Sequence, residues 1–276
     1  MPELPEVETI RQRISPLLLG KTITKVVVQR PDVVGFPEVA KFKAGLKDKT
    51  IVQIGRRGKY LLLFLSDNKI LIIHLRLSGH LRVITDKEKP DYERVRFGLN
   101  DRTALVFIEP RALGRVYLVT PAEIPSILKG LTKMGREPIE ENFNANYLYS
   151  FLKRRKAKIK TVLLDQRVCA GVGNIYSDEA LFLAKINPNR PANSLNWTEV
   201  QRLSRALKLT VKNGIKFLGT TMSDQRYLLP DGTKGRFQER LKVFRCEGKS
   251  CPTCGKPIIR TRIGNRSSYF CPICQI

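Results

Sequence analysis

The sequence predicts a multidomain α+β protein, in which an N-terminal helix and an antiparallel β-sandwich precede a helical region and a small cysteine-rich β-hairpin. Three observations lead to this class. Short runs rich in Val, Ile, Leu and Phe extend to residue 119, helical periods replace them after residue 140, and two Cys-x2-Cys pairs close the chain. At 276 residues, the chain is long enough for two domains and a small appendage.

The N-terminal region begins with a predicted helix over residues 3–19, because Leu4, Val7 and Ile10 recur at three- and four-residue steps before Gly20. Seven predicted strands follow, at residues 23–29, 51–56, 60–65, 70–75, 94–99, 104–108 and 115–119. Turn signals separate these strands at near-regular intervals. This spacing is typical of an antiparallel sandwich or barrel.

Strand signals stop after Pro121, and glycine and proline residues between 130 and 140 predict a hinge. Four helical segments are predicted beyond it, at residues 144–155, 161–164, 177–184 and 198–214. The last segment, residues 241–276, is predicted to form two strands that cross the cysteine pairs, with a turn at residues 262–266. The chain therefore divides into a β region, a helical region and a short tail.

The four cysteines of the tail have the spacing of a structural metal site. Two Cys-x2-Cys knuckles, with sixteen residues between them, supply four thiolates for one tetrahedral Zn²⁺ and leave no open position for water. The alternative is a pair of disulfides in a secreted protein. The proposed ligands are Cys251, Cys254, Cys271 and Cys274; Cys169 and Cys246 have no partner motif and are expected to be ordinary packed or surface thiols.

The composition points to a polyanionic partner. The chain carries 50 Lys and Arg against 25 Asp and Glu, a formal charge of +25. Two clusters stand out: six basic residues at 153–160, including Lys156, and ten in the tail from Asp231. They predict a continuous nucleic-acid surface, with a solvated basic face as the alternative. No apolar run reaches the length of a membrane span and the N-terminus is acidic, so we expect a soluble, cytoplasmic protein that does not act at a membrane.

The N-terminus carries a second chemical signal. Methionine is usually removed before a residue as small as proline, which would expose the secondary amine of Pro2. An α-amino group has a pKa near 8 and is nucleophilic around neutral pH, and its addition to a sugar aldehyde carbon gives a cationic iminium. Glu3 could serve beside it as a general acid or base. The alternative is that Pro and Glu here only begin a helix.

Five segments occur here in an order that resembles one family from end to end. They are residues 1–9 (Met-Pro-Glu-Leu-Pro-Glu-Val-Glu-Thr), 56–61 (Arg-Arg-Gly-Lys-Tyr-Leu), 74–79 (His-Leu-Arg-Leu-Ser-Gly), 171–176 (Gly-Val-Gly-Asn-Ile-Tyr) and 271–275 (Cys-Pro-Ile-Cys-Gln). The chain thus resembles the bacterial formamidopyrimidine-DNA glycosylases, also called 8-oxoguanine DNA glycosylases. Leu4 resembles this branch rather than the sister branch, endonuclease VIII.

The resemblance implies a bifunctional glycosylase and lyase of base excision repair, which removes oxidised purines and cleaves the strand by β,δ-elimination. It implies a β-sandwich at residues 1–130, a hinge at 131–140, a helix-two-turn-helix domain with a lesion loop at 141–235, and a zinc-finger hairpin at 236–276. The implied partner is double-stranded DNA with oxidised bases or abasic sites, bound between the domains by a monomer that associates with the nucleoid. An endonuclease VIII-like preference for pyrimidines and a non-catalytic damage-binding protein are the alternatives.

Roles follow from the motifs that match. Pro2 corresponds to the nucleophile at C1′, Glu3 to the acid/base group and Glu6 to its support one turn along. Lys59 corresponds to a lysine that contacts the phosphate beside the lesion and assists β-elimination, although a strand-edge lysine is the simpler interpretation. The motifs also match Asn174 and Arg266 to a pair of residues that bind the same phosphates. Arg266 is the position linked to δ-elimination. Asn174 could instead cap a helix.

The family fills the vacated base stack with side chains from two loops, and here the sequence departs from its pattern. Leu77 replaces the usual methionine, and the usual Pro-Arg-Arg-Phe-Gly reads Pro-Arg-Ala-Leu-Gly at residues 110–114. Arg111 keeps the position that faces the orphaned base. Leu113 can still wedge a base step but lacks a flat stacking face, and Ala112 cannot hold a phosphate. Residues 219–232 match the family's lesion loop at both ends.

Overall fold

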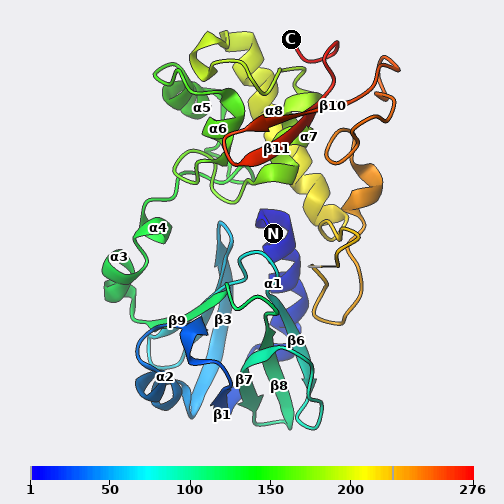
Figure 1. The fold of residues 1–276 in the computed structure, drawn as a ribbon. Helices are drawn as coiled ribbons and strands as arrows, with labels where there is room; N and C mark the ends of the chain where they lie inside the picture. The colour runs from blue at the N-terminus through cyan, green and yellow to red at the C-terminus, as the bar shows by residue number, and fades with distance from the viewer. Residues whose placement is uncertain (1, 226) are drawn as a thin grey trace. The chain divides into compact units, whose positions relative to one another are not determined.

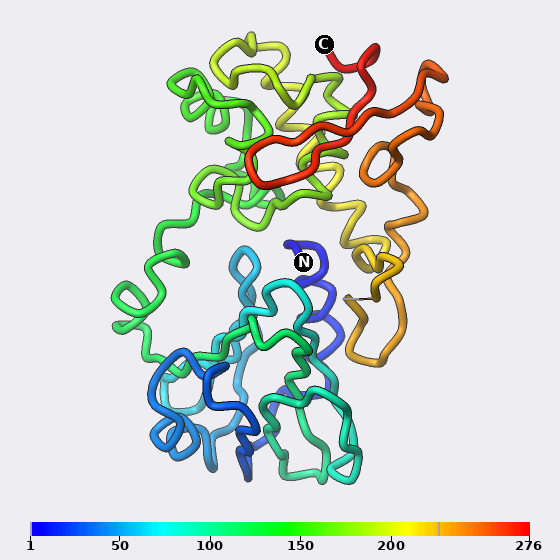
Figure 2. The backbone as a smooth tube through the Cα atoms, in the orientation of Figure 1, coloured from blue at the N-terminus to red at the C-terminus, as the bar shows by residue number. Residues whose placement is uncertain are grey.

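The computed structural model describes residues 2–225 and 227–276, which form two compact units. One unit combines Met1–Thr132 with Leu218–Arg236, and the other combines Lys133–Phe217 with Phe237–Ile276. The segment Leu218–Arg236 thus packs with the N-terminal unit, although it follows the last long helix in the chain. Figure 2 shows this segment, coloured yellow to orange, returning beside the N-terminal helix.

Helix α1 (Leu4–Leu18) opens the first unit and matches the predicted helix. Val7, Ile10, Ile14 and Leu18 of this helix are buried in the core. The helix contacts strands β3, β4 and β6, and Figure 1 shows it beside β3 and β6. The chain leaves the helix through Gly20, whose φ of +76° favours glycine. Helical spacing therefore identified both the element and its buried face.

Nine strands form the sandwich, and seven of them lie where the sequence predicts. They are β1 (Thr22–Val28), β2 (Val34–Phe36), β3 (Lys49–Arg57), β4 (Tyr60–Leu65), β5 (Ile70–His74), β6 (His80–Thr85), β7 (Glu93–Leu99), β8 (Thr103–Ile108) and β9 (Arg115–Val119). Their order is β2-β9-β5-β4-β3-β1-β7-β8-β6. A short pairing of β1 with β3, at Thr22 with Thr50 and Ile23 with Lys49, joins the two halves, and their apolar faces form one core. The sandwich prediction is confirmed.

The sequence did not predict five α-helices and strands of this unit, nor its 3₁₀ turns at Pro31–Val33 and Pro121–Glu123. Three are short: β2, α3 (Ile124–Ile127) and α4 (Lys129–Thr132). The others are α2 (Val39–Leu46) and β6. In β6 only Leu81 and Ile84 are buried, so the alternation of buried and exposed residues is weak. One feature departs from an antiparallel sandwich, because β2 pairs parallel with β9. Short edge elements carry too few apolar residues for a periodic signal.

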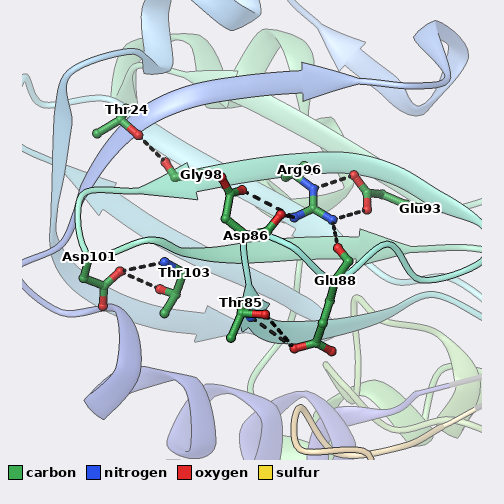
Figure 3. A network of polar contacts seen from close by, with 9 residues as sticks. All are labelled: Thr24, Thr85, Asp86, Glu88, Glu93, Arg96, Gly98, Asp101 and Thr103. Carbon is green, nitrogen blue, oxygen red and sulfur yellow. Dashed lines mark hydrogen bonds and ion pairs between the residues drawn. The ribbon is translucent and has the colours of Figure 1, made fainter.

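Polar contacts hold the loop between β6 and β7 (Figure 3). The Arg96 guanidinium donates to both carboxylate oxygens of Glu93, at 2.9 and 2.7 Å, and to the carbonyls of Asp86 and Glu88. The hydrogen bonds that Arg96 donates to Glu93 raise the pKa of Arg96. A single guanidinium thus satisfies two carbonyl groups of a loop that lacks a core of its own.

The second unit is helical, as predicted, and ends in a hairpin. Its elements are α5 (Ala145–Leu152), α6 (Ile159–Leu164), α7 (Asn174–Leu183), α8 (Trp197–Lys216), β10 (Ile259–Ile263) and β11 (Arg266–Phe270), with 3₁₀ turns at Ala192–Ser194 and Phe237–Arg240. Asn196 caps the start of α8, because its side chain accepts a hydrogen bond from the Glu199 amide. The Glu199 carboxylate in turn accepts a hydrogen bond from the Asn196 amide. Helix α7 packs against both α8 and β11. Among the described residues, no helix is long and apolar enough to cross a bilayer.

The hairpin corrects one prediction. Strands β10 and β11 lie between the cysteine pairs rather than across them, and Ile263 pairs directly with Arg266. The turn is therefore only Gly264 and Asn265, and Gly264 has a φ of +55°. Arg262, Ile263 and Arg266 lie on strands, so the hairpin is longer and its turn tighter than the predicted five-residue turn.

Candidate active site

The start of helix α1 buries two carboxylates in reciprocal hydrogen bonds. The Glu3 amide donates to Glu6 Oε2 at 2.8 Å, and the Glu3 side chain accepts from the Glu6 amide, which forms a capping box. Pro2 is buried, and the exposed fractions of Glu3 and Glu6 are 2% and 1%. The capping box therefore holds the side chain of Glu3, the residue that follows Pro2, in one orientation.

The second oxygen of Glu6 reaches a distant segment of the same unit. Glu6 Oε1 accepts from the Thr220 amide at 2.8 Å. A Cβ on Gly219, whose φ is +77°, would lie only 3.0 Å from this oxygen, so glycine allows the close approach. The Tyr227 hydroxyl donates to the Leu218 carbonyl, and burial, together with the Glu6 charge, raises the pKa of Tyr227. Glu6 therefore anchors the segment that the resemblance identifies as the lesion loop.

Lys59 lies in the two-residue turn between β3 and β4 and is only 7% exposed. Gly58 precedes it with a φ of +56°. The Arg56 guanidinium donates to the Gly58 carbonyl at 3.0 Å and to Glu8 Oε2 of α1 at 3.0 Å. Burial alone would raise the pKa of Glu8, but hydrogen bonds from Arg11 and Arg56 hold it below the usual value. This link ties the turn of Lys59 to the helix of Glu3.

His74 lies near Lys59 as a buried neutral ring. Its Nδ1 accepts from the Arg76 amide at 3.0 Å, and the Tyr60 ring packs against it edge-on at 4.4 Å. Burial, with the charges of Arg76 and Lys59, lowers the pKa of His74 to about 3. Because Nδ1 accepts a hydrogen bond, the ring proton lies on Nε2.

The His74 environment predicts acid sensitivity. Unfolded His74 takes up a proton near pH 6.5, whereas the folded form resists it until about pH 3. The free energy of unfolding should therefore fall between pH 6.5 and 3, by on the order of a few kcal/mol from this group. Urea unfolding of the parent and of His74→Gln across this range measures the effect. The variant should show the shallower slope; equal slopes would contradict this assignment.

The side chains expected to enter the DNA stack lie on two loops of the first unit. Leu77 is half-buried, Arg111 is exposed and Leu113 is 39% exposed. Ala112 between them is buried, with a φ of +51° that few residues other than glycine adopt. The loop from 109 to 114 therefore presents alternate side chains outward from a constrained backbone.

In the second unit, Asn174 and the hairpin of Arg266 are in contact. Asn174 is the first residue of α7, and its side-chain amide donates to the Ser267 carbonyl at 2.9 Å, so it does not cap the helix. A pocket on the hairpin carries three guanidinium groups. It is lined by Arg260, Thr261, Arg262, Asn265, Arg266 and Ser267. Such a pocket beside a helix N-terminus suits phosphate oxygens.

The basic cluster at residues 153–160 is only partly a surface. Lys156 is exposed, as a DNA contact requires, whereas Lys160 is completely buried and forms a 2.6 Å ion pair with buried Asp178. Asp178 also accepts from the Ser268 hydroxyl at 2.6 Å, and Lys160 donates to the Asn174 carbonyl at 3.0 Å. The prediction that Lys160 belongs to the nucleic-acid surface is wrong. Its charge instead joins α6, α7 and β11.

This buried pair predicts a large effect on stability. Lys160→Met should lower the free energy of unfolding of the second unit by about 3–5 kcal/mol, because Asp178 would remain as an uncompensated buried charge. The double variant Lys160→Met with Asp178→Asn should recover part of the loss. Urea unfolding followed by circular dichroism measures both. A single variant as stable as the parent would show that Asp178 is not held as a charged partner.

The four tail cysteines form a site for one structural zinc ion. Their sulfur atoms all lie within 4.8 Å of one another, with Cys251 to Cys274 at 3.9 Å and Cys254 to Cys271 at 3.5 Å. Four sulfurs at 2.3 Å from a tetrahedral zinc would be about 3.8 Å apart, so the donor set fits. The disulfide alternative is wrong, because a disulfide needs about 2.05 Å. Cys169 is buried and Cys246 half-buried, away from this cluster.

The sequence did not identify three supporting residues, two of which act through contacts that are distant in the chain. Thr220 meets Glu6 across 214 positions, and Asp178 meets Ser268 across 90. Glu109 is fully buried and binds the loop of Arg111 and Leu113. Its only sequence signal was a charged residue at the end of the apolar run 104–108.

Comparison with known families matches three modules in the order of the fold. Residues 1–116 match the model for the formamidopyrimidine-DNA glycosylase N-terminal domain, and residues 134–226 match that for its H2TH domain. Residues 248–276 match a zinc finger found in FPG and IleRS. A sandwich with a buried acidic helix start, a helix-two-turn-helix module and a four-cysteine hairpin is the architecture of a class of DNA glycosylases.

Individual relatives agree over the full length. The formamidopyrimidine-DNA glycosylase of Pelotomaculum thermopropionicum is 45% identical over 276 residues, covering 100% of this chain and 99% of the relative. The crystal structure of the Thermus thermophilus Fpg protein has a TM-score of 0.91 at 41% identity, over 99% of this chain and 98% of that one. A Lactococcus lactis Fpg complex with DNA containing Fapy-dG has a TM-score of 0.90 at 33% identity, over 99% of both chains. The chain belongs to the formamidopyrimidine-DNA glycosylase family.

Proposed function

We propose that the protein is a bifunctional DNA glycosylase and abasic-site lyase that removes oxidised purines. The buried pair of Pro2 and Glu3 at the start of α1 carries this proposal, because removal of Met1 would leave a secondary amine on the residue next to a carboxylate that the Glu6 amide holds in place. Family membership supports the substrate class, since related Lactococcus lactis structures contain Fapy-dG or abasic-site DNA.

Base release begins when the Pro2 nitrogen forms a bond to C1′ and loses its proton. The bond between C1′ and the base breaks, and its electron pair leaves with the base, which takes up a proton. The nitrogen lone pair then expels O4′, which accepts a proton from Glu3, and an iminium remains at C1′. The secondary amine reaches this cation without a further proton loss, so the iminium is an effective electron sink.

Strand cleavage follows from the acidity of the iminium. Loss of a proton from C2′ expels the 3′ phosphate, and a later loss from C4′ expels the 5′ phosphate. Water then hydrolyses the iminium, which frees Pro2 and releases the sugar remnant as an aldehyde. Lys59 would assist the first elimination at the phosphate beside the lesion, and Arg266 the second. Burial leaves Lys59 largely shielded from bulk water, which strengthens its attraction for a phosphate.

DNA binding would combine phosphate contacts with a wedge. Lys59, Lys156, Asn174 and Arg266 are the proposed phosphate contacts, and Leu77, Arg111 and Leu113 would enter the stack when the base is extruded. The formal charge of +25 favours association with the bacterial nucleoid. We propose that the protein acts there as a monomer, since one chain carries the complete set of groups.

Borohydride trapping tests the chemistry. The processed protein is incubated with a duplex carrying 8-oxoguanine opposite cytosine, reduced, digested and analysed by mass spectrometry. Met1 lies outside the described residues, so N-terminal sequencing first establishes that Pro2 is free. A DNA adduct on Pro2 is the expected result. An adduct only with thymine glycol would move the substrate class to pyrimidines, and tight binding without any adduct would identify a non-catalytic damage-binding protein.

A further inference from the structure

The carboxylate of Glu109 holds the loop that carries Arg111 and Leu113 by its amide groups. Oε1 accepts from the Arg111 amide at 3.1 Å, and Oε2 accepts from the amides of Leu113 and Gly114 at 2.8 and 2.6 Å. The Ser78 hydroxyl also donates to Oε1, from the neighbouring loop that carries Leu77. One fully buried side chain thus binds both loops.

Two arginines hold the carbonyl groups of the same loop. Arg94 donates to the carbonyls of Glu109 and Pro110, at 2.7 and 3.2 Å. Arg115 donates to the carbonyls of Ala112 and Gly114, at 2.9 and 2.8 Å. Most backbone groups of residues 109–114 are therefore bound by Arg94 of β7, Arg115 of β9 and Glu109 of the loop itself. These bonds rigidify a loop with an unfavourable φ at Ala112.

The two loops also share one ring. A Cβ on Gly114 would lie 2.4 Å from Phe107 Cζ, and a Cβ on Gly79 would lie 2.9 Å from Phe107 Cε2 and 2.6 Å from the Leu75 carbonyl. Both glycines are therefore required by close packing rather than by turn geometry. The Phe107 ring near the end of β8 and the Glu109 carboxylate just beyond it therefore fix both loops.

We propose that Glu109 and Ser78 are positioning residues that couple the two loops, so that Leu77, Arg111 and Leu113 enter the duplex as one rigid element. This inference rests on the proposed glycosylase function. Leucine at position 113 cannot gain the stacking energy of a flat ring, so the element depends on its rigidity to compete with the stacked base. Ordering these side chains before contact removes an entropy cost from the extrusion step.

Ser78→Ala isolates the coupling, because it removes the bond between the loops and leaves the three amide bonds to Glu109. Single-turnover kinetics compare a duplex with 8-oxoguanine, whose base must be unstacked, with a duplex carrying a preformed abasic site. A 2-aminopurine beside the lesion reports unstacking by fluorescence. Excision of 8-oxoguanine and the fluorescence phase should both slow by roughly tenfold, the scale of removing one hydrogen bond to a charged group. Abasic-site cleavage should be unchanged.

Controls separate this inference from stability and from the proposed function. Ser126→Ala removes an exposed hydroxyl of the same unit that donates to the Glu123 carbonyl, and should match the parent. Glu109→Met, which removes both carboxylate oxygens, should slow extrusion more than Ser78→Ala. The double variant should be no slower than Glu109→Met, because the bond from Ser78 is already absent in it. Equal losses on both duplexes, or no loss on either, would overturn the coupling. Failure of the parent to trap abasic DNA would instead overturn the proposed function.

Discussion

Glu3→Gln is expected to lower the single-turnover rate of Schiff-base formation, and therefore of strand cleavage, by a factor of roughly 10²–10⁴, the usual contribution of a positioned acid or base. Glutamine keeps the size of the side chain but cannot give a proton to O4′. Glu3 is 2% exposed, so bulk water has little access to replace it as the proton donor. Rapid-quench kinetics on a duplex with 8-oxoguanine measures the loss.

The fold should survive this substitution. The Glu3 side chain also accepts from the Glu6 amide in the capping box, and the glutamine carbonyl can accept the same bond. The melting temperature and the DNA affinity should therefore stay close to those of the parent. Glu38→Gln, at an exposed carboxylate far from α1 in the sequence, is the matched control. A Glu3→Gln variant with a full rate of strand cleavage would assign the proton transfer to another group.

The sequence predicted the parts of the fold that have a strong local period. Helix α1 begins and ends within one residue of the predicted bounds, because its apolar residues recur at helical spacing over fifteen residues. Strands β4, β5 and β8 were predicted because nearly all of their residues are apolar and buried. Strand β2 has three residues and no such pattern. The place of Leu218–Arg236 in the first unit depends on contacts with α1 that no local period encodes.

The candidate site divides in the same way. The cysteine ligands follow from spacing alone. The roles of Pro2 and Glu3 were predicted from the chemistry of a free secondary amine together with the family resemblance. The environment of each charge could not be predicted, because it depends on residues far apart in the sequence. Lys160 shows the difference. Its place beside five other basic residues suggested a DNA surface, but its side chain is completely buried and pairs with Asp178.

Loss of zinc is the other change with a large expected effect. Cys254→Ser should release the metal and disorder the hairpin, because so short a segment has too small a core to fold alone. The hairpin carries Arg260, Arg262 and Arg266. The slope of log K against log salt should therefore become shallower by about 0.9 for each phosphate that the hairpin no longer binds, with a marked fall in DNA affinity at low salt. Zinc analysis by mass spectrometry and fluorescence anisotropy at several salt concentrations measure both quantities.

The hairpin is also attached to α7, so its disorder should reach beyond the DNA contacts. The Ser267 carbonyl accepts from Asn174, and Ser268 donates to Asp178, which pairs with Lys160. When β11 loosens, Asn174 loses its partner and water reaches the buried ion pair, so the second unit should unfold at a lower urea concentration. Cys246→Ser, at a thiol outside the metal cluster, should match the parent in zinc content, affinity and stability. If Cys254→Ser kept both its DNA affinity and its slope of log K against log salt, the hairpin could not be a main phosphate contact. The phosphate contacts would then have to come from the first unit and the helices of the second.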